Sequence, residues 1–100
     1  MEKYDIDNDK HIIAIGQVVE ECAEITCKAY LAWRRSRSEK RIDSYRETIQ
    51  YTLSQIPNVE FRYILKQPFG FVFTIYGVDY KFFVFKIGSR LLRGSCIQMD

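Results

Sequence analysis

Apolar residues recur at alternating steps of three and four along the first third of the chain. They form a seam sustained over three heptads: Ile12, Ile15, Val19, Cys22, Thr26, Ala29 and Trp33. Because Asp7, Asn8 and Asp9 supply N-caps before this seam, the pattern predicts a helix over residues 9–35. At 1.5 Å per residue this helix is about 40 Å long, whereas a globule of this size has a radius of gyration of about 13 Å. The helix should therefore span the domain or project beyond it.

The seam is a candidate helix interface because its middle consists of small side chains, Cys22, Thr26 and Ala29. These let another helix approach closely, and that helix belongs either to the same chain or to a second copy. Gly16 costs the helix about 1 kcal/mol relative to alanine. Its presence indicates a close helix contact at that point.

A second helix is predicted over residues 39–55, with Ser38 as its N-cap and Pro57 as its stop. Its apolar stripe lies half a turn out of phase with the seam of the first helix, which predicts a break near residues 36–38. The stripe consists of Ile42, Tyr45, Ile49, Leu53 and Ile56.

After Pro57 the apolar period changes from helical to two, which predicts a sheet over residues 58–97. The first strand should bury alternate side chains, and the third, residues 80–87, is apolar on both faces. That third strand should lie centrally or be covered on both sides. The alternating positions of the first strand are Val59, Phe61, Tyr63 and Leu65.

The predicted order of elements gives the fold class. Two N-terminal helices, the first of them long, pack on a three- to four-stranded antiparallel β-meander. The fold is α+β, and residues 1–100 form a single domain.

Composition and charge limit the kinds of protein that this chain can be. With 47% hydrophobic and 15% aromatic residues, the chain has ample material for a core and is expected to fold. Charges interrupt every apolar run, and the acidic start lacks the order of a signal peptide, so we expect no membrane contact and a cytoplasmic location. Residues 1–24 hold seven acids against two lysines, a balance of −5, which leaves +7 for residues 25–100 from the net +2. This uneven distribution of charge favours either a partner that binds in one orientation or a contact between the acidic and basic parts of the chain itself.

The densest positive charge lies between the two predicted helices. Arginines in the last turn of the first helix are stabilised by the helix dipole and need no ligand. Cations in the first turn of the second helix are disfavoured, so this region is a candidate anion or partner site. The anion would be a nucleic-acid phosphate, an acidic protein surface, or the chain's own acidic residues 1–24 folded back. The candidate residues are Arg34, Arg35, Arg37, Ser38, Lys40 and Arg41.

The sequence contains no catalytic or cofactor motif. One histidine and three scattered cysteines do not have metal-site spacing, so no metal, cofactor or catalytic residue is predicted. One enzyme class escapes this argument, the metal-independent endoribonuclease toxins, which work with arginine, lysine and tyrosine. The residues that one sheet face would need for this are Arg62, Lys66, Tyr80, Lys81, Lys86 and Arg90.

The leading expectation is a small non-enzymatic regulatory protein that acts through protein–protein contacts. Its partner is another protein or a second copy in a homodimer, as in a phage- or plasmid-type inhibitor of a host nucleic-acid enzyme. The alternative is a nucleic-acid-binding protein that uses the basic region 34–41. The metal-independent ribonuclease is the third hypothesis.

Overall fold

Two helices form the first half of the chain, α1 (Glu2–Ser36) and α2 (Glu39–Ser54). The computed structural model describes the backbone of residues 2–89 and 91–99 and the side chains of residues 9–89 and 91–99. The predicted start of the first helix at Asp9 is wrong, because α1 already begins at Glu2. Residues 2–9 contain no glycine or proline, and their acids lie where the helix dipole favours negative charge.

The predicted break between the helices is confirmed. Arg37 has a left-handed backbone conformation (φ 53°), and its amide donates a 2.8 Å hydrogen bond to the carbonyl of Trp33. This is the usual αL termination of a helix, although the residue is not glycine. Ser38 is the N-cap of α2, but its side chain makes no capping hydrogen bond.

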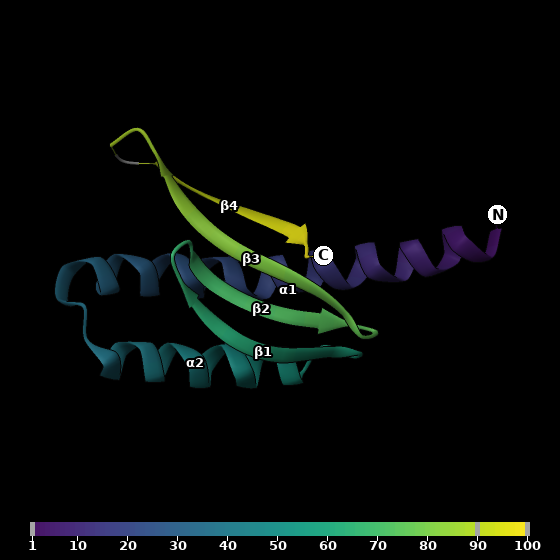
Figure 1. The fold of residues 1–100 in the computed structure, drawn as a ribbon, viewed down its shortest axis with the longest axis horizontal. Coiled ribbons are helices and arrows are strands. Elements are labelled where there is room, and N and C mark those ends of the chain that lie inside the picture. Colours follow the sequence, from purple (N-terminus) through teal and green to yellow (C-terminus); the bar gives the residue numbers. More distant parts are fainter. Residues whose placement is uncertain (1, 90, 100) are drawn as a thin grey trace.

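Four strands follow the helices: β1 (Val59–Lys66), β2 (Phe69–Ile75), β3 (Val78–Ile87) and β4 (Leu91–Gln98). All neighbours pair antiparallel in the order β1-β2-β3-β4, so the predicted meander is confirmed (Figure 1). The third strand is internal, as predicted. The strand buried at every position, however, is β2.

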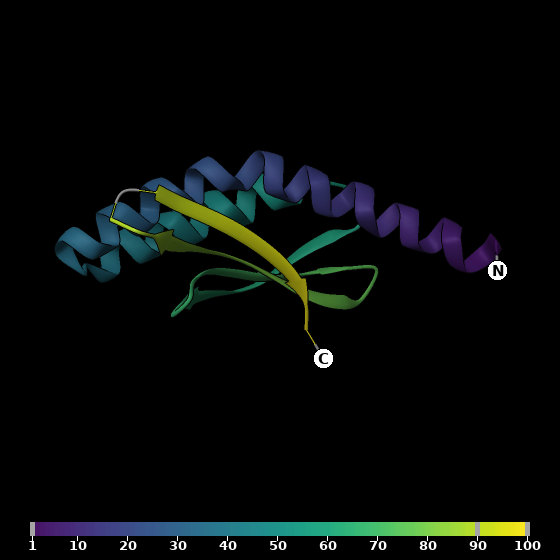
Figure 2. The ribbon, with the colours of Figure 1, turned by 90° about the horizontal axis from the view of Figure 1, so that it is seen from above.

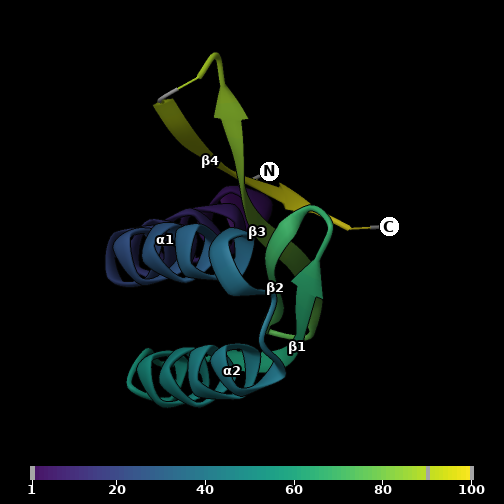
Figure 3. The same cartoon turned by 90° about the vertical axis from the view of Figure 1, so that its left-hand side faces the viewer.

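Both helices lie on one face of the sheet, which makes the molecule two-layered (Figures 2 and 3). α1 runs along the longest dimension, 49 Å, and its N-terminal end extends beyond the sheet. The core lies between the layers. Its largest buried side chains are Phe69, Phe71, Phe73 and Phe82 from the sheet with Ile42, Ile49, Leu53 and Val18 from the helices.

The predicted alternation along β1 is only half correct. Val59 and Phe61 face the helices, but the register then shifts between Phe61 and Tyr63. This β-bulge at Arg62 reverses the faces of the following residues. Ile64 therefore packs against the core, while Tyr63 is half exposed.

The predicted helix interface is used mainly within the chain. Cys22 and Thr26 are fully buried, and α1 packs against both α2 and the sheet. Ile12, by contrast, is 57% exposed, because the buried row begins with Ala14 and Val18, outside the predicted seam, and joins the seam only at Cys22 and Thr26. The remaining seam residues are half-buried against the core: Ile15, Val19, Ala29 and Trp33. The close contact predicted at Gly16 is wrong, since nothing lies within 4 Å of where its Cβ would be.

Candidate functional site: a basic cleft with an aromatic wall

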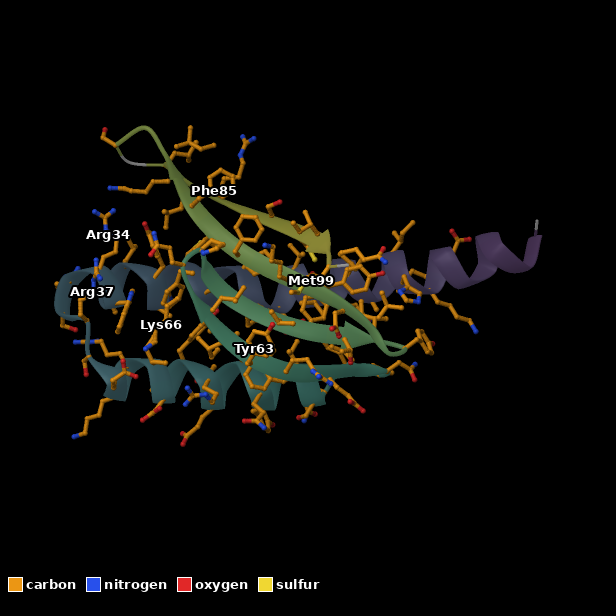
Figure 4. The ribbon with its side chains drawn as sticks, viewed as in Figure 1. Arg34, Arg37, Tyr63, Lys66, Phe85 and Met99 are labelled. Carbon is orange, nitrogen blue, oxygen red and sulfur yellow. The ribbon has the colours of Figure 1, made fainter. Side chains whose placement is uncertain are left out.

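A cleft of about 310 Å³ opens where the C-terminal end of α1 meets the ends of β1 and β3. Four cations line it, and we call this surface the basic cleft: Arg34, Arg37, Lys66 and Lys86, around Tyr30 and Trp33. Figure 4 shows Arg34, Arg37 and Lys66 gathered at this end of the molecule.

Local structure explains how separate segments deliver these cations. Arg34 is in the last turn of α1 and Arg37 directly follows the helix. Lys66 is the last residue of β1 and pairs with Phe69, which in turn pairs with Val84 of β3. Lys86 follows two residues later on the same side of β3 as Val84, because side chains alternate along a strand. The pairing of β1 with β2 and of β2 with β3 thus brings both lysines to the end of α1.

The aromatic side chains of the cleft lie against its cations. The guanidinium of Arg34 is 5.8 Å from the ring centroid of Tyr30. Two cations lie over Trp33: the Arg37 guanidinium at 5.6 Å and the Lys66 ammonium at 5.4 Å. These are cation–π distances. The rings hold the long side chains at the cleft without neutralising their charge.

Among the described side chains, one carboxylate pairs with a cation of the basic cleft. Glu39 Oε2 accepts a 2.8 Å hydrogen bond from Lys66 Nζ, and both side chains are well exposed. Among the described side chains, Arg34, Arg37 and Lys86 form no ion pair. The cleft therefore carries a net excess of positive charge in a concave site, where low-dielectric walls focus the field.

The other residues of the predicted cluster 34–41 lie outside this cleft. Arg35, Lys40 and Arg41 are exposed, and the Nε of Arg41 donates a 2.8 Å hydrogen bond to the hydroxyl of Ser36. Ser38 is half-buried as the N-cap of α2. Of the six predicted residues, the structure brings only Arg34 and Arg37 into the cleft with the two strand lysines.

The chain's own acidic residues do not fold back onto the cluster. Asp9 and Arg34 are 25 residues apart in one continuous helix, which separates them by about 38 Å. Glu24 is the acid of residues 1–24 nearest to the cleft along the helix, and it pairs with Lys28 at 2.9 Å. The acidic residues of the N-terminal segment therefore leave the charge of the cleft unmatched.

The sheet face required by the ribonuclease hypothesis is not assembled. Lys66 and Lys86 line the basic cleft, whereas Lys81 points away from the helices. Tyr80 is buried on the helix side and its hydroxyl is 2.8 Å from His11 Nδ1. Arg90 lies outside the described residues, and Arg62 occupies the bulge of β1.

A second surface distinguishes this molecule, the side of the sheet that faces away from the helices. Neither α1 nor α2 covers it (Figures 2 and 3), and Figure 4 shows Tyr63 and Phe85 on it. Cross-strand pairing places the side chains of this outer face in rows. It includes Tyr63, Leu65, Val72, Lys81, Phe83, Phe85, Ile87, Leu91, Arg93 and Ile97, with Glu60, Thr74 and Asp79 at one end.

The three cysteines are poor nucleophiles. Burial raises the pKa of the Cys22 thiol to about 12, helped by the charge of Glu21, and raises that of Cys96 to about 11. Burial also raises the pKa of Cys27. Within residues 9–89 and 91–99, no group of three His, Cys, Asp or Glu side chains is close enough to hold a metal ion.

Sequence reasoning missed the contribution of Lys66 and Lys86 to the cleft. Lys66 is the last residue of the first predicted strand, and Lys86 is the next-to-last residue of the third. A two-residue connection after Lys66 places the end of β1 beside the start of β2. That spacing was the available signal.

No protein-family model matches the chain, and neither the curated proteins nor the solved structures give a significant match. The described part of the chain has no helix long and apolar enough to cross a membrane.

Proposed function

We propose that this protein is a non-enzymatic binding protein whose basic cleft holds single-stranded nucleic acid. The observation that carries the proposal is the convergence of four cations from three elements on one cleft, where only Lys66 of the four forms an ion pair within the part of the chain that the structure describes. Like charges gathered in this way repel one another, and a bound polyanion relieves the repulsion. The sequence favoured a protein partner; the cleft favours nucleic acid because its positive charge is not matched internally.

A single strand fits the cleft better than a duplex does. Its phosphates can be held by the arginines and lysines, while an unpaired base can stack on an aromatic ring. Trp33 is the ring for this role, since it forms the wall between Arg37 and Lys66. Both cations sit on long side chains and can move from the ring to a phosphate. In a duplex the faces of the bases are stacked on one another and do not reach the wall.

The chain contains one tryptophan, so binding has an intrinsic probe. Titration with an oligothymidylate of about ten nucleotides, within the usual site size of such proteins, should quench Trp33 fluorescence. With up to four phosphate contacts, log K should fall against log salt with a slope of about −3. Arg37→Gln and Lys86→Gln should each weaken binding several-fold and make the slope shallower by about 0.7.

Arg35→Gln is the matched control, because Arg35 belongs to the same helix end but lies outside the cleft. It should leave the affinity nearly unchanged. Equal losses in the Arg35 and Arg37 variants would show diffuse charge attraction instead of a site. Equally tight binding of polyglutamate would show an acidic-protein site, and equally tight duplex binding without quenching would remove the stacking role of Trp33.

The raised pKa values of the three cysteine thiols motivate the non-enzymatic part of this proposal. A ribonuclease assay in chelator on the same oligoribonucleotides tests it, and product formed by the parent chain but not by the Lys66→Gln variant would overturn it. The phage- or plasmid-type inhibitor role stays a prediction.

A further inference from the structure

We infer that the outer face of the sheet is an interface with a second copy of this chain, in an antiparallel, face-to-face dimer. This surface is separate from the basic cleft, apart from Phe85, which borders both. The inference therefore does not rest on nucleic-acid binding.

The outer face exposes large apolar side chains over several adjacent strands. Tyr63 is 49% exposed, Ile97 45% and Phe85 37%. Val72 lies in the same row, between Tyr63 and Lys81, and it is buried although neither α1 nor α2 covers that side. A contiguous apolar surface of this kind marks an interaction site when it is rimmed by polar groups. Stacking on a second sheet is the usual way in which sheets bury such faces.

The charges of the outer face make it complementary to itself. Glu60 and Asp79 both pair with Thr74, so the two carboxylates lie in one row near the end of the sheet where β2 finishes and β3 begins. Arg93 pairs with Phe85 three rows further along, toward the opposite end. Arg62 offsets one of the two acids, which leaves that end negative.

A two-fold axis between the sheets and perpendicular to the strands exchanges these two ends. It places Asp79 of one copy near Arg93 of the other, twice, with the apolar rows in contact between them. This self-complementarity is what an isologous two-fold interface requires. A second copy therefore supplies an opposite charge near each end of the face.

Lys81 lies within the apolar region and must be accommodated. Its ammonium is 5.5 Å from the ring centroid of Phe83, so an aromatic ring already holds the charge. The lysine chain adds apolar area while its end remains beside the ring.

The area of the outer face indicates how tightly two copies should associate. Four strands at ~4.8 Å and the four rows of outward side chains from Asp79 to Arg93 at about 6.6 Å cover roughly 500 Å² per copy. About 1,000 Å² in total is the lower limit for a specific interface. We therefore expect a reversible dimer with a dissociation constant of about 1–100 μM, rather than an obligate one.

The test is sedimentation velocity across concentrations that bracket this range, on the full chain. Ile97→Lys should raise the dissociation constant at least ~10-fold, because two buried ammonium groups would lie in the apolar contact. Ile13→Lys is the matched control: the same substitution at an even more exposed isoleucine, 62%, on α1. It should leave dimerisation unchanged. Circular dichroism and thermal melts confirm that both variants fold.

A charge exchange tests the predicted orientation. Asp79→Lys and Arg93→Glu should each weaken the dimer, and the double variant should recover most of the loss. A parent chain that is monomeric at all concentrations would overturn the inference. So would a dimer broken by Ile13→Lys but not by Ile97→Lys, which indicates a helix interface. If the losses of dimer affinity from Asp79→Lys and Arg93→Glu add up in the double variant, the antiparallel face-to-face arrangement is excluded. A dimer formed by pairing of the two β4 edges would give this additive result.

These outcomes are independent of the cleft. Loss of dimerisation in Ile97→Lys with Trp33 quenching retained would separate the two surfaces. Loss of quenching in Arg37→Gln with the dimer retained would separate them in the other direction.

Discussion

The hydroxyl groups of Thr26 on α1 and Tyr45 on α2 are hydrogen-bonded to each other at 2.9 Å inside the core. Thr26 is fully buried and Tyr45 nearly so, and neither hydroxyl is left without a partner. The pair fixes the position of one helix against the other, because a buried polar group that loses its partner costs free energy.

Thr26→Val should lower the free energy of unfolding by about 1–3 kcal/mol, since the Tyr45 hydroxyl then stays buried and unpaired. Tyr45→Phe should cost less, because the Thr26 hydroxyl can donate instead to the carbonyl four residues earlier in its helix. Urea denaturation of both single variants and the double variant checks this. The double variant should lose less than the sum of the single losses; an additive result would contradict the coupling.

Alkaline pH should destabilise the fold through the buried thiols. The pKa of Cys22 is raised from 9.0 to about 12 and that of Cys96 to about 11, both chiefly by burial. The stability that these buried thiols contribute is fully present below pH 9, where the thiols are protonated in both the folded and the unfolded chain. It is lost as pH rises toward 11–12, because the unfolded chain releases protons first.

For Cys22 alone the loss between pH 8 and pH 10 should be about 1.4 kcal/mol. Denaturant titrations at these two pH values measure it. Cys22→Ala starts from a lower stability because of its cavity, but its loss over the same interval should be smaller by about that amount. A parent chain with the same stability at pH 8 and pH 10 would exclude the thiol linkage.

The sequence was sufficient for features that depend on local periodicity. The helical spacing of residues 12–33 and 42–56 and the strand alternation that follows predicted two helices and a three- to four-stranded meander. The half-turn difference between the two apolar stripes was enough to predict the break that the structure places at Arg37 and Ser38. Each of these signals involves residues that are neighbours in the chain.

Features that depend on pairing between distant segments were not predictable. The bulge at Arg62 exists because β1 has one more residue than β2 opposes, and this reverses the faces of Tyr63 and Ile64. The basic cleft depends on the same register, since only the pairing of Lys66 with Phe69 and of Phe69 with Val84 brings the two lysines to α1. The cluster predicted from the sequence at residues 34–41 therefore contains only two of the four cations that line the cleft, Arg34 and Arg37.

Two glycines should respond in opposite ways to alanine. At Gly16 no atom lies within 4 Å of the added Cβ, so Gly16→Ala should raise the free energy of unfolding by about 0.5–1 kcal/mol through helix propensity. At Gly70 the Cβ would meet the carbonyl oxygen of Phe82 and approach Phe83 Cα to 2.6 Å. Both neighbours are backbone atoms of the paired strand and cannot move aside.

Gly70→Ala should therefore cost several kcal/mol, more than an ordinary core substitution, and separate β2 from β3 locally. Thermal melts of the two variants beside the parent make the comparison. Equal and small effects at both positions would contradict the close approach of the strands at Gly70.

Arg37 has two properties that a pair of substitutions can separate. Its left-handed backbone conformation costs roughly 1–2 kcal/mol in a residue other than glycine, while its guanidinium lies over Trp33 in the basic cleft. Arg37→Gly removes both the strain and the charge, and Arg37→Gln removes only the charge. Glycine also gives the unfolded chain more conformational freedom, which offsets about 0.5–1 kcal/mol of the stability gained by relieving the strain.

We therefore expect Arg37→Gly to raise the free energy of unfolding by up to about 1 kcal/mol while it weakens oligothymidylate binding as much as Arg37→Gln does. Urea denaturation and Trp33 quenching on the same samples give both values. A glycine variant that is more stable and binds less shows that the residue is kept for its ligand at the expense of the helix end. Full binding by either variant would remove Arg37 from the site, and a destabilised glycine variant would show that the arginine side chain supports the fold instead.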